Sequence, residues 1–367
     1  MTATSSAVLR TDATSGRYLH IDALRAMAVL LVVAMHAGLP KVPGDSGVMA
    51  FFVISGFVIT HVVLREQEKT NAFRIGDFYF KRAFKILPPL LIAVVVPTII
   101  FGFVFKVFSV DLGSVAGQVF FYSNWQQAFG GGSGILPGTN VVWSLGIEEQ
   151  FYIVFAILWV VLVRGRNSRR DLATIAIALI VLVPLWRVVL ILQGADIARL
   201  LRATDTRIDA IAWGVLLATV YAMYRQNGAR YLTRLGHPLW IGVALVVAVT
   251  GFVSSNDIYE ITVRFVTVPA ATAFLIAFGL VAPAGVVQSA FLRLASARIV
   301  QLIGLSSYSI YLVHYPFAKL IDAWVPWGPS LQGVLVKIVV GVLAGIAMYK
   351  VVEIPSLRLR RSIETRS

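Results

Sequence analysis

Ten apolar runs, each near 20 residues long, follow one another from Leu19 to Val352 and leave little room for a soluble fold. An α-helix needs about 20 apolar residues to cross the hydrocarbon core of a bilayer. The composition agrees, since 58% of the 367 residues are hydrophobic and 14% are charged. The sequence therefore predicts an all-α polytopic membrane protein. The predicted spans cover residues 19–37, 46–64, 86–105, 141–163, 173–193, 206–224, 237–253, 259–282, 299–321 and 333–351.

The basic residues alternate between the links that join these spans. One set of links, together with both tails, carries 21 Lys and Arg residues, whereas the other set carries 4. Because cytoplasmic links are enriched in Lys and Arg, this asymmetry predicts that both termini are cytoplasmic. It also explains the net charge of +14 without nucleic-acid binding. We expect a cytoplasmic tail (1–18), one transmembrane domain (19–352) and a basic cytoplasmic tail (353–367).

The sequence excludes some chemistry from the start. It contains no cysteine, so disulfides, thiolate nucleophiles and cysteine metal sites are ruled out. We expect neither a metal ion nor a permanently bound cofactor. The first 18 residues are polar and no small-residue cleavage site follows the first apolar run, so we expect this run to be retained as a helix.

Several ionisable residues fall within the spans, where a charge costs on the order of 3 kcal/mol unless it is paired or solvated. Arg25 and His36 are eleven residues apart, so they share one helix face at roughly 16 Å separation along the axis. Arg82 and Lys85 are neighbours at the cytoplasmic edge of the third span. Two such cations can hold a phosphate, or they can simply anchor the helix at the inner surface.

The outer half of the predicted bundle also holds acid–base groups. Glu148 and Glu149 point about 100° apart where the fourth span begins, so at least one of them should face a polar interior. The other polar residues in this half are His36, Arg207, Asp209 and His314. Together these residues predict a polar route with a cationic inner end and an acid–base outer end. Such a route fits an enzyme that takes a donor from the cytoplasm, and it also fits a proton-coupled transporter.

The motifs resemble those of membrane acyltransferase family 3, whose members O-acylate bacterial cell-surface and secreted glycans. The resemblance runs from the first predicted span to the last. The matching blocks are Ile21–Arg25 with His36, Phe51–Phe57, Arg82–Pro88, Trp143–Tyr152, Arg207–Asp209 with Gly214, Tyr308–His314 and Glu353–Pro355. Each block is weak evidence alone, whereas their joint order is specific.

The resemblance implies an acyl-CoA donor, usually acetyl-CoA, that binds from the cytoplasm. It implies a sugar hydroxyl as acceptor, on a glycan or lipid-linked glycan such as exopolysaccharide, O-antigen or a lipo-oligosaccharide. It also implies a place in the bacterial cytoplasmic membrane. Some family members carry an added esterase-like domain. Only about 15 residues follow the last predicted span of this sequence, so we expect a stand-alone type that completes transfer itself or with a separate periplasmic partner.

The same resemblance implies roles for individual residues. His36 would be the general base or relay, Arg25 would steady the thioester, and Glu148 or Glu149 would orient His36. Arg82 and Lys85 would bind the CoA phosphates, although a lysine at position 85 lacks the bidentate fork of arginine. The residues expected at the acceptor are Arg207, Asp209, His314, Glu149 and Trp143. The alternative function remains a proton-coupled glycan transporter or exporter.

Overall fold

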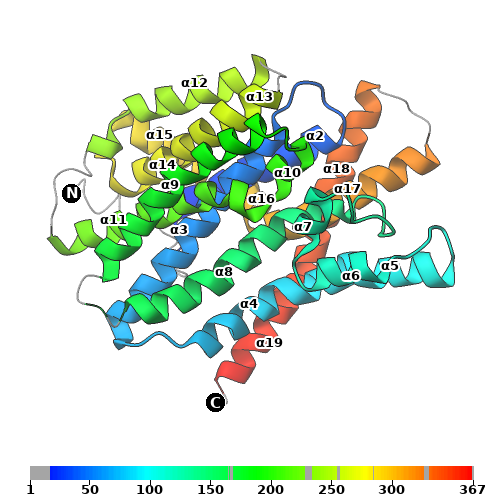
Figure 1. Cartoon of the computed structure of the whole chain (residues 1–367), viewed down its shortest axis with the longest axis horizontal. Helices are drawn as coiled ribbons and strands as arrows, with labels where there is room; N and C mark the ends of the chain where they lie inside the picture. The colour runs from blue at the N-terminus through cyan, green and yellow to red at the C-terminus, as the bar shows by residue number, and fades with distance from the viewer. Residues whose placement is uncertain are drawn as a thin grey trace.

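The computed structural model describes residues 17–163, 165, 168–227, 234–253, 257–283, 285–325 and 330–365. Within these residues every regular element is a helix, and the helices form one bundle (Figure 1). Most of the N-terminal tail predicted for residues 1–18 lies outside the described residues. So do five residues of the predicted charge asymmetry, namely Arg10, Arg164, Arg166, Arg230 and Arg366.

The helices follow the predicted apolar runs. The first half of the chain forms α2 (Leu19–His36), α3 (Gly44–Thr70), α4 (Ile75–Leu90), η1 (Leu91–Val95), α5 (Val96–Ile99), η2 (Ile100–Val104), α6 (Leu112–Val119), α7 (Ser123–Ala128), η3 (Thr139–Val142), α8 (Trp143–Leu162) and α9 (Ser168–Leu192). The second half forms α10 (Ile197–Arg202), η4 (Thr204–Thr206), α11 (Ile208–Asn227), α12 (Leu239–Val253), α13 (Asp257–Tyr259), η6 (Glu260–Arg264), α14 (Phe265–Val281), α15 (Val286–Ala295), α16 (Arg298–Leu305), α17 (Ser307–Trp324), α18 (Leu331–Met348), η7 (Tyr349–Glu353) and α19 (Ile354–Glu364).

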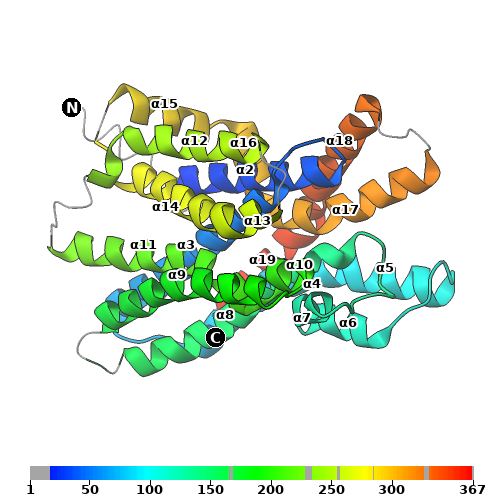
Figure 2. The same cartoon turned by 45° about the horizontal axis from the view of Figure 1, so that its top comes forward.

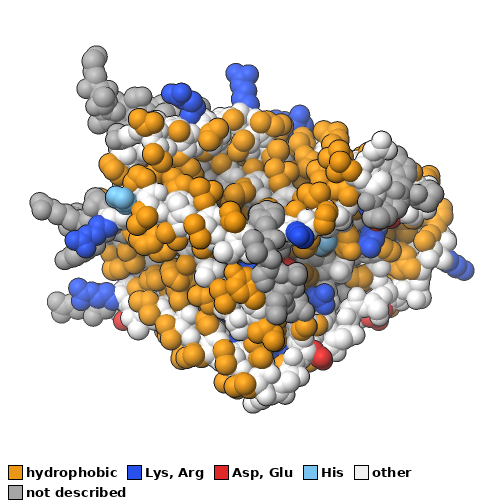
Figure 3. All heavy atoms as spheres, turned by 90° about the horizontal axis from the view of Figure 1, so that it is seen from above, with side chains coloured by type: hydrophobic (Ala, Val, Ile, Leu, Met, Phe, Trp, Pro, Cys, Tyr) orange, Lys and Arg blue, Asp and Glu red, His pale blue; other side chains and the backbone are white. Residues whose placement is uncertain are grey.

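Seven helical segments of the described chain have the length and hydropathy needed to cross a membrane, and the bent pair α15–α16 would make an eighth. The other predicted runs on α11, α12 and α17 are also helical but fall short of that length or hydropathy. Hydrophobic side chains cover most of the face seen in Figure 3, as a lipid-facing surface requires. The predicted all-α polytopic membrane class is confirmed.

Two predicted boundaries differ from the structure. The expected span 299–321 is divided at Ser306, whose hydroxyl and backbone N–H both donate to the Leu302 carbonyl, at 2.7 and 3.0 Å. The last span and the predicted tail (353–367) are not separate elements, because α18 continues as a helix through η7 into α19. Glu353, at the predicted boundary, is buried and accepts a hydrogen bond from Ser309 at 2.8 Å.

Helices α17 and α18 lie side by side in both views of the bundle (Figures 1 and 2). Gly341 and Gly345 form the contact surface of α18. A Cβ atom on Gly345 would lie 2.3 Å from the Cα atom of Ile310, and one on Gly341 would lie 3.1 Å from the Cβ atom of His314. Gly341 and Gly345 therefore give the close packing typical of a GxxxG pair, and the partner helix is α17 of the same chain.

We expect Gly345→Ala to destabilise the protein by about 1–3 kcal/mol, because the added methyl group would force α18 away from the Ile310 backbone. Thermal denaturation of the detergent-solubilised protein measures the effect. Gly242→Ala on α12 is the matched control, since a Cβ atom there meets nothing within 4 Å. Equal melting temperatures for the two variants would contradict this packing.

Candidate active site

A cavity of about 130 Å³ lies between α2, α3, α4, α8 and α17. Its charged lining side chains are Arg25, Arg82, Lys85, Glu148 and Glu149. Three cations therefore face two carboxylates, which leaves an excess of positive charge. The fold brings together all three cations predicted to bind the donor, although they come from two different helices.

Among the described residues, Arg25 and Lys85 are the two cavity cations that have no bonded carboxylate. The Nε atom of Arg25 donates to the Ser307 hydroxyl at 3.1 Å, a neutral partner. Among the described residues, Lys85 makes no ion pair or hydrogen bond. Glu353 acts on Lys85 electrostatically while it accepts from Ser309. Two cations held close together without a bonded carboxylate form a site for an anion.

Arg82 is in a different state from Lys85. Its Nη2 atom donates to Glu149 Oε1 at 2.8 Å, and its guanidinium lies 3.4 Å from the centre of the Tyr152 ring. Of the predicted pair of phosphate ligands, Arg82 and Lys85, Arg82 is therefore already ion-paired with Glu149. Glu149 was predicted to contact the acceptor, and in this conformation it neutralises Arg82 instead.

Glu148 is held by two hydroxyl groups. Its Oε2 atom accepts hydrogen bonds from Ser55 Oγ at 2.6 Å and from Tyr152 at 2.8 Å. Ser55 and Tyr152 also contact each other. The expected role of Glu148 was to orient His36, yet among the described residues its hydrogen bonds go to α3 and to its own helix. Glu148 therefore joins α3 to α8 at the wall of the cavity.

His36 contacts a second histidine. Its Nδ1 atom lies 3.0 Å from the Nε2 atom of His314, and its ring stacks on Tyr315 with centroids 4.3 Å apart. The sequence predicted both histidines for the site, but it gave no reason to pair them. The His36–His314 pair (these two rings together) joins the end of α2 to the middle of α17.

The cavity ends before it reaches the His36–His314 pair. Val48 lines the cavity, and the preceding residue, Gly47, packs against Ala28 and Val32 of α2. His36 therefore lies about one helical turn or more beyond the cavity end. Tyr311 connects the two sites, since its side chain lines the cavity and its carbonyl oxygen lies 2.8 Å from His314 Nδ1.

Arg207 and Asp209 do not act as a pair. Asp209 forms a two-pronged ion pair with Arg187 of α9, at 2.9 and 2.8 Å, and both side chains are buried. The guanidinium of Arg207 lies 3.7 Å from the centre of the Phe265 ring and 5.9 Å from that of Trp143. Among the described residues neither Nη atom of Arg207 has a hydrogen-bond partner. Of the predicted acceptor residues, Arg207 and Trp143 are therefore close in the fold, whereas Asp209 is ion-paired with Arg187.

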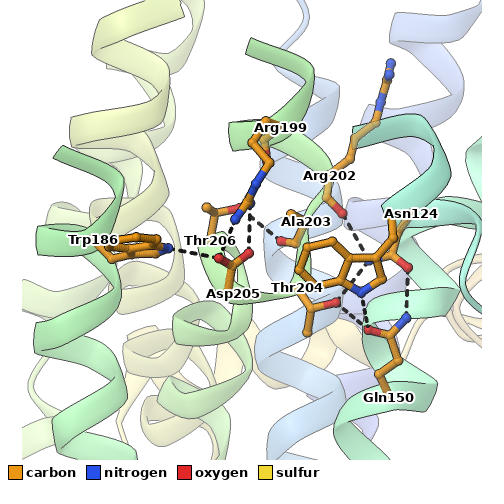
Figure 4. Close-up of polar contacts among 10 residues, drawn as sticks. Asn124, Gln150, Trp186, Arg199, Arg202, Ala203, Thr204, Asp205 and Thr206 are labelled. Atoms are coloured by element: carbon orange, nitrogen blue, oxygen red, sulfur yellow. Dashed lines mark hydrogen bonds and ion pairs between the residues drawn. The ribbon is translucent and has the colours of Figure 1, made fainter. Parts of the chain in front are cut away.

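A polar network ties α7 and α10 to the first turns of α8 (Figure 4). Gln150 Nε2 donates to Asn124 Oδ1 at 2.8 Å, and Asn124 Nδ2 donates to Thr204 Oγ1 at 3.0 Å. Asp205 accepts from Arg199 and from Trp186, whose Nε1 atom is 2.9 Å away. These bonds fix the segment that precedes α11 and hence the start of the helix that carries Asp209.

The Asp205 carboxyl in this network has a shifted pKa. Partial burial raises the pKa, but the hydrogen bonds from Arg199 and Trp186 and the charge of Arg199 outweigh burial and hold it below its ordinary value. The stabilisation from this carboxylate is therefore present above the pKa of an unfolded Asp. It is lost as the pH falls through the lowered pKa of the folded state.

Several residues of the site had no role assigned from the sequence. Tyr152 lies four residues after Glu148 on the same helix face, which is a signal that could have linked them. Ser55, Tyr311 and Glu353 stand in the matching blocks and Ser307 directly precedes one, but nothing in one sequence shows what they touch. Arg187 falls within the predicted span 173–193, and its ion-pair partner Asp209 is on another helix, which one sequence does not show.

The fold and the cavity define a polytopic membrane protein with a buried cationic site beside a histidine pair. The family model described as an acyltransferase domain matches residues 18–350. The chain therefore belongs to membrane acyltransferase family 3. The family resemblance predicted from its motifs is confirmed.

Two relatives are similar over most of the chain. It is 29% identical over 324 residues to the peptidoglycan O-acetyltransferase OatA of Listeria monocytogenes, which covers 85% of the chain and 51% of that protein. It is 27% identical over 354 residues to the O-acetyltransferase OatA of Staphylococcus aureus, which covers 93% of the chain and 57% of that protein. The match thus spans little more than half the length of these relatives. No solved structure matches the chain.

Proposed function

We propose that this protein is an O-acyltransferase that moves an acetyl group from acetyl-CoA to a hydroxyl group of a bacterial cell-surface glycan. The observation that carries the proposal is the cationic cavity that adjoins the His36–His314 pair through Tyr311. The names of the relatives, which are O-acetyltransferases, support the reaction class and the glycan acceptor. The protein would work in the cytoplasmic membrane.

The donor would bind through its negative charge. Arg25 and Lys85 face the cavity without a bonded carboxylate, so they would attract the phosphates of CoA. The cavity of about 130 Å³ is smaller than the roughly 300–1,000 Å³ of pockets that enclose a drug-sized ligand. It would therefore hold only part of the donor, with the phosphates at the cationic lining, the adenosine outside and the acyl arm directed towards His36.

His36 would act as the general base. The acceptor oxygen attacks the thioester carbonyl while the imidazole takes the hydroxyl proton, and the carbon–sulfur bond breaks. The imidazolium then returns its proton to the CoA thiolate. Because the cavity ends short of His36, the layer of Phe51 and Tyr311 must open for the acyl group to pass.

The test of the function is transfer of label from radioactive acetyl-CoA. Membranes that contain the protein are incubated with peptidoglycan fragments, lipid-linked glycans or exopolysaccharide. We expect base-labile label in one glycan fraction and equal release of free CoA. A proton-coupled transporter would consume no acetyl-CoA, so binding of glycan without acetyl transfer in any fraction would overturn the proposal.

We expect Lys85→Ala to weaken CoA binding about tenfold, because the variant loses one of the two cations that face the cavity without a bonded carboxylate. Thermal stabilisation of the solubilised protein by increasing CoA concentrations measures the dissociation constant.

Lys81→Ala is the matched control for this prediction. Lys81 lies one turn earlier on α4 and is exposed, and it is not part of the cavity lining. CoA binding by the Lys81 variant should equal that of the wild type. Equal weakening by both substitutions would show that only the general charge of the surface matters, and the cavity would lose its role.

A further inference from the structure

The hydrogen bonds of His314 define where its proton lies. Its Nδ1 atom is 2.8 Å from the carbonyl oxygen of Tyr311 and 3.1 Å from that of Ile310. Carbonyl oxygens only accept, so Nδ1 must carry the proton. In the part of the chain that the structure describes, no carboxylate bonds to His314, which is 1% exposed. A buried imidazole without a countercharge is neutral, and its Nε2 atom is then a hydrogen-bond acceptor.

The position of the proton on His314 determines which ring nitrogen of His36 is protonated. Since His314 Nε2 accepts, the Nδ1 atom of His36 at 3.0 Å must donate to it. The Nε2 atom of a neutral His36 is then unprotonated and free to take a proton. If the chain of bonds ran in the opposite direction, His36 Nε2 would carry a hydrogen atom and could not act as a base.

We infer that His314 is a positioning residue that holds His36 in the tautomer required for general-base catalysis. The inference rests on the proposed role of His36 in acyl transfer. It places on α17 the orienting group that the sequence led us to expect at Glu148 on α8. A second histidine whose ring nitrogen fixes the tautomer of a reactive histidine acts in the same way as the groups that hydrogen-bond to metal-bound histidines.

The surroundings of the pair are built to hold this geometry. Tyr315 stacks on the His36 ring, and Gly341 of α18 lets that helix approach the Cβ atom of His314. Gly138 packs against the backbone of Tyr315 and Pro316 with a φ angle of +89°, which only glycine adopts easily. The charged side chains that act on His36 are Asp45 of α3 and Lys319 of α17, and they have opposite signs.

The test compares three substitutions of His314 in the full-length protein. His314→Leu removes the acceptor and should lower kcat about 10- to 100-fold with little change in KM for acetyl-CoA. His314→Gln places an amide oxygen near the Nε2 position and should recover most of the lost rate. His314→Glu adds a carboxylate that favours the protonated form of His36, so the acidic limb of the pH–rate profile should move to higher pH by about one unit or more.

Each outcome separates this inference from the proposed function. A purely structural role for His314 would leave the folded Gln variant no more active than the folded Leu variant, because the acceptor atom at position 314 would not matter, and that result would overturn the inference. If His36→Ala is inactive but His314→Leu keeps the wild-type rate, the inference fails and the proposed function stands. If His36→Ala keeps full activity, the proposed function itself fails. Should the Leu variant not fold, as judged by loss of CoA stabilisation, the Gln and Glu variants still decide.

Discussion

His36→Ala should lower the rate of acetyl transfer by about 10²- to 10⁴-fold, the usual contribution of a positioned general base. The loss should appear in kcat, because His36 lies outside the cavity that would bind the donor. Thermal stabilisation by CoA should therefore be the same in the variant and the wild type. Initial rates with labelled acetyl-CoA at saturating concentrations, together with the CoA melting curves, measure the two effects separately.

His237→Ala is the control for the loss of an imidazole. His237 is exposed at the start of α12, where its Nδ1 atom accepts from the Leu239 amide. We expect this variant to transfer acetyl groups at the wild-type rate. An His36 variant that retained even half of that rate would remove His36 from the mechanism. One that lost CoA stabilisation as well would point to general unfolding instead of lost catalysis.

The helices could be predicted from the sequence because their cause is local. Hydrophobic runs of the right length must be helical in a bilayer, where each backbone polar group needs a partner within its own segment. All ten predicted runs lie on helices for this reason. The close packing of α18 at Gly345 also has a local signal in the sequence, since a small residue every four positions leaves a groove along one face of a helix.

The partners of the site residues could not be predicted, because they depend on which helices face each other. Spacing showed that Arg25 and His36 share one side of a helix, but it did not show that α17 supplies Ser307 to the first and His314 to the second. It also made Arg82 and Lys85 neighbours without revealing that Glu149 neutralises Arg82. One sequence gives the face of a helix, whereas the fold determines what lies opposite.

The close pair Arg207 and Asp209 shows the same limit at short range. Arg207 lies in the turn between η4 and α11 and Asp209 lies in the first turn of α11, so their side chains leave the backbone in different directions and face different neighbours. Asp209 meets Arg187 on α9, while Arg207 meets the ring of Phe265 on α14. The role in acceptor binding predicted for Asp209 now competes with a structural role, and the two differ in what a substitution does.

We expect Asp209→Ala to destabilise the protein by about 3–5 kcal/mol, because it leaves the buried guanidinium of Arg187 without its countercharge. Removing both charges should be far less harmful than removing one, since well-packed apolar residues can replace a buried ion pair. The double variant Arg187→Met with Asp209→Leu should therefore recover most of the lost melting temperature. Thermal denaturation in detergent of the wild type, the single variants Arg187→Met and Asp209→Leu, and the double variant gives the coupling between the two positions.

The double variant also decides between the two roles of Asp209. If Asp209 serves the fold alone, the double variant should regain acetyl transfer along with its stability, and KM for the glycan acceptor should match that of the wild type. If Asp209 contacts the acceptor, the double variant will be stable but will show a raised KM for the glycan. An Asp209→Ala protein that melts like the wild type would contradict the structural role, because a bidentate ion pair at this depth cannot lose one partner without loss of stability.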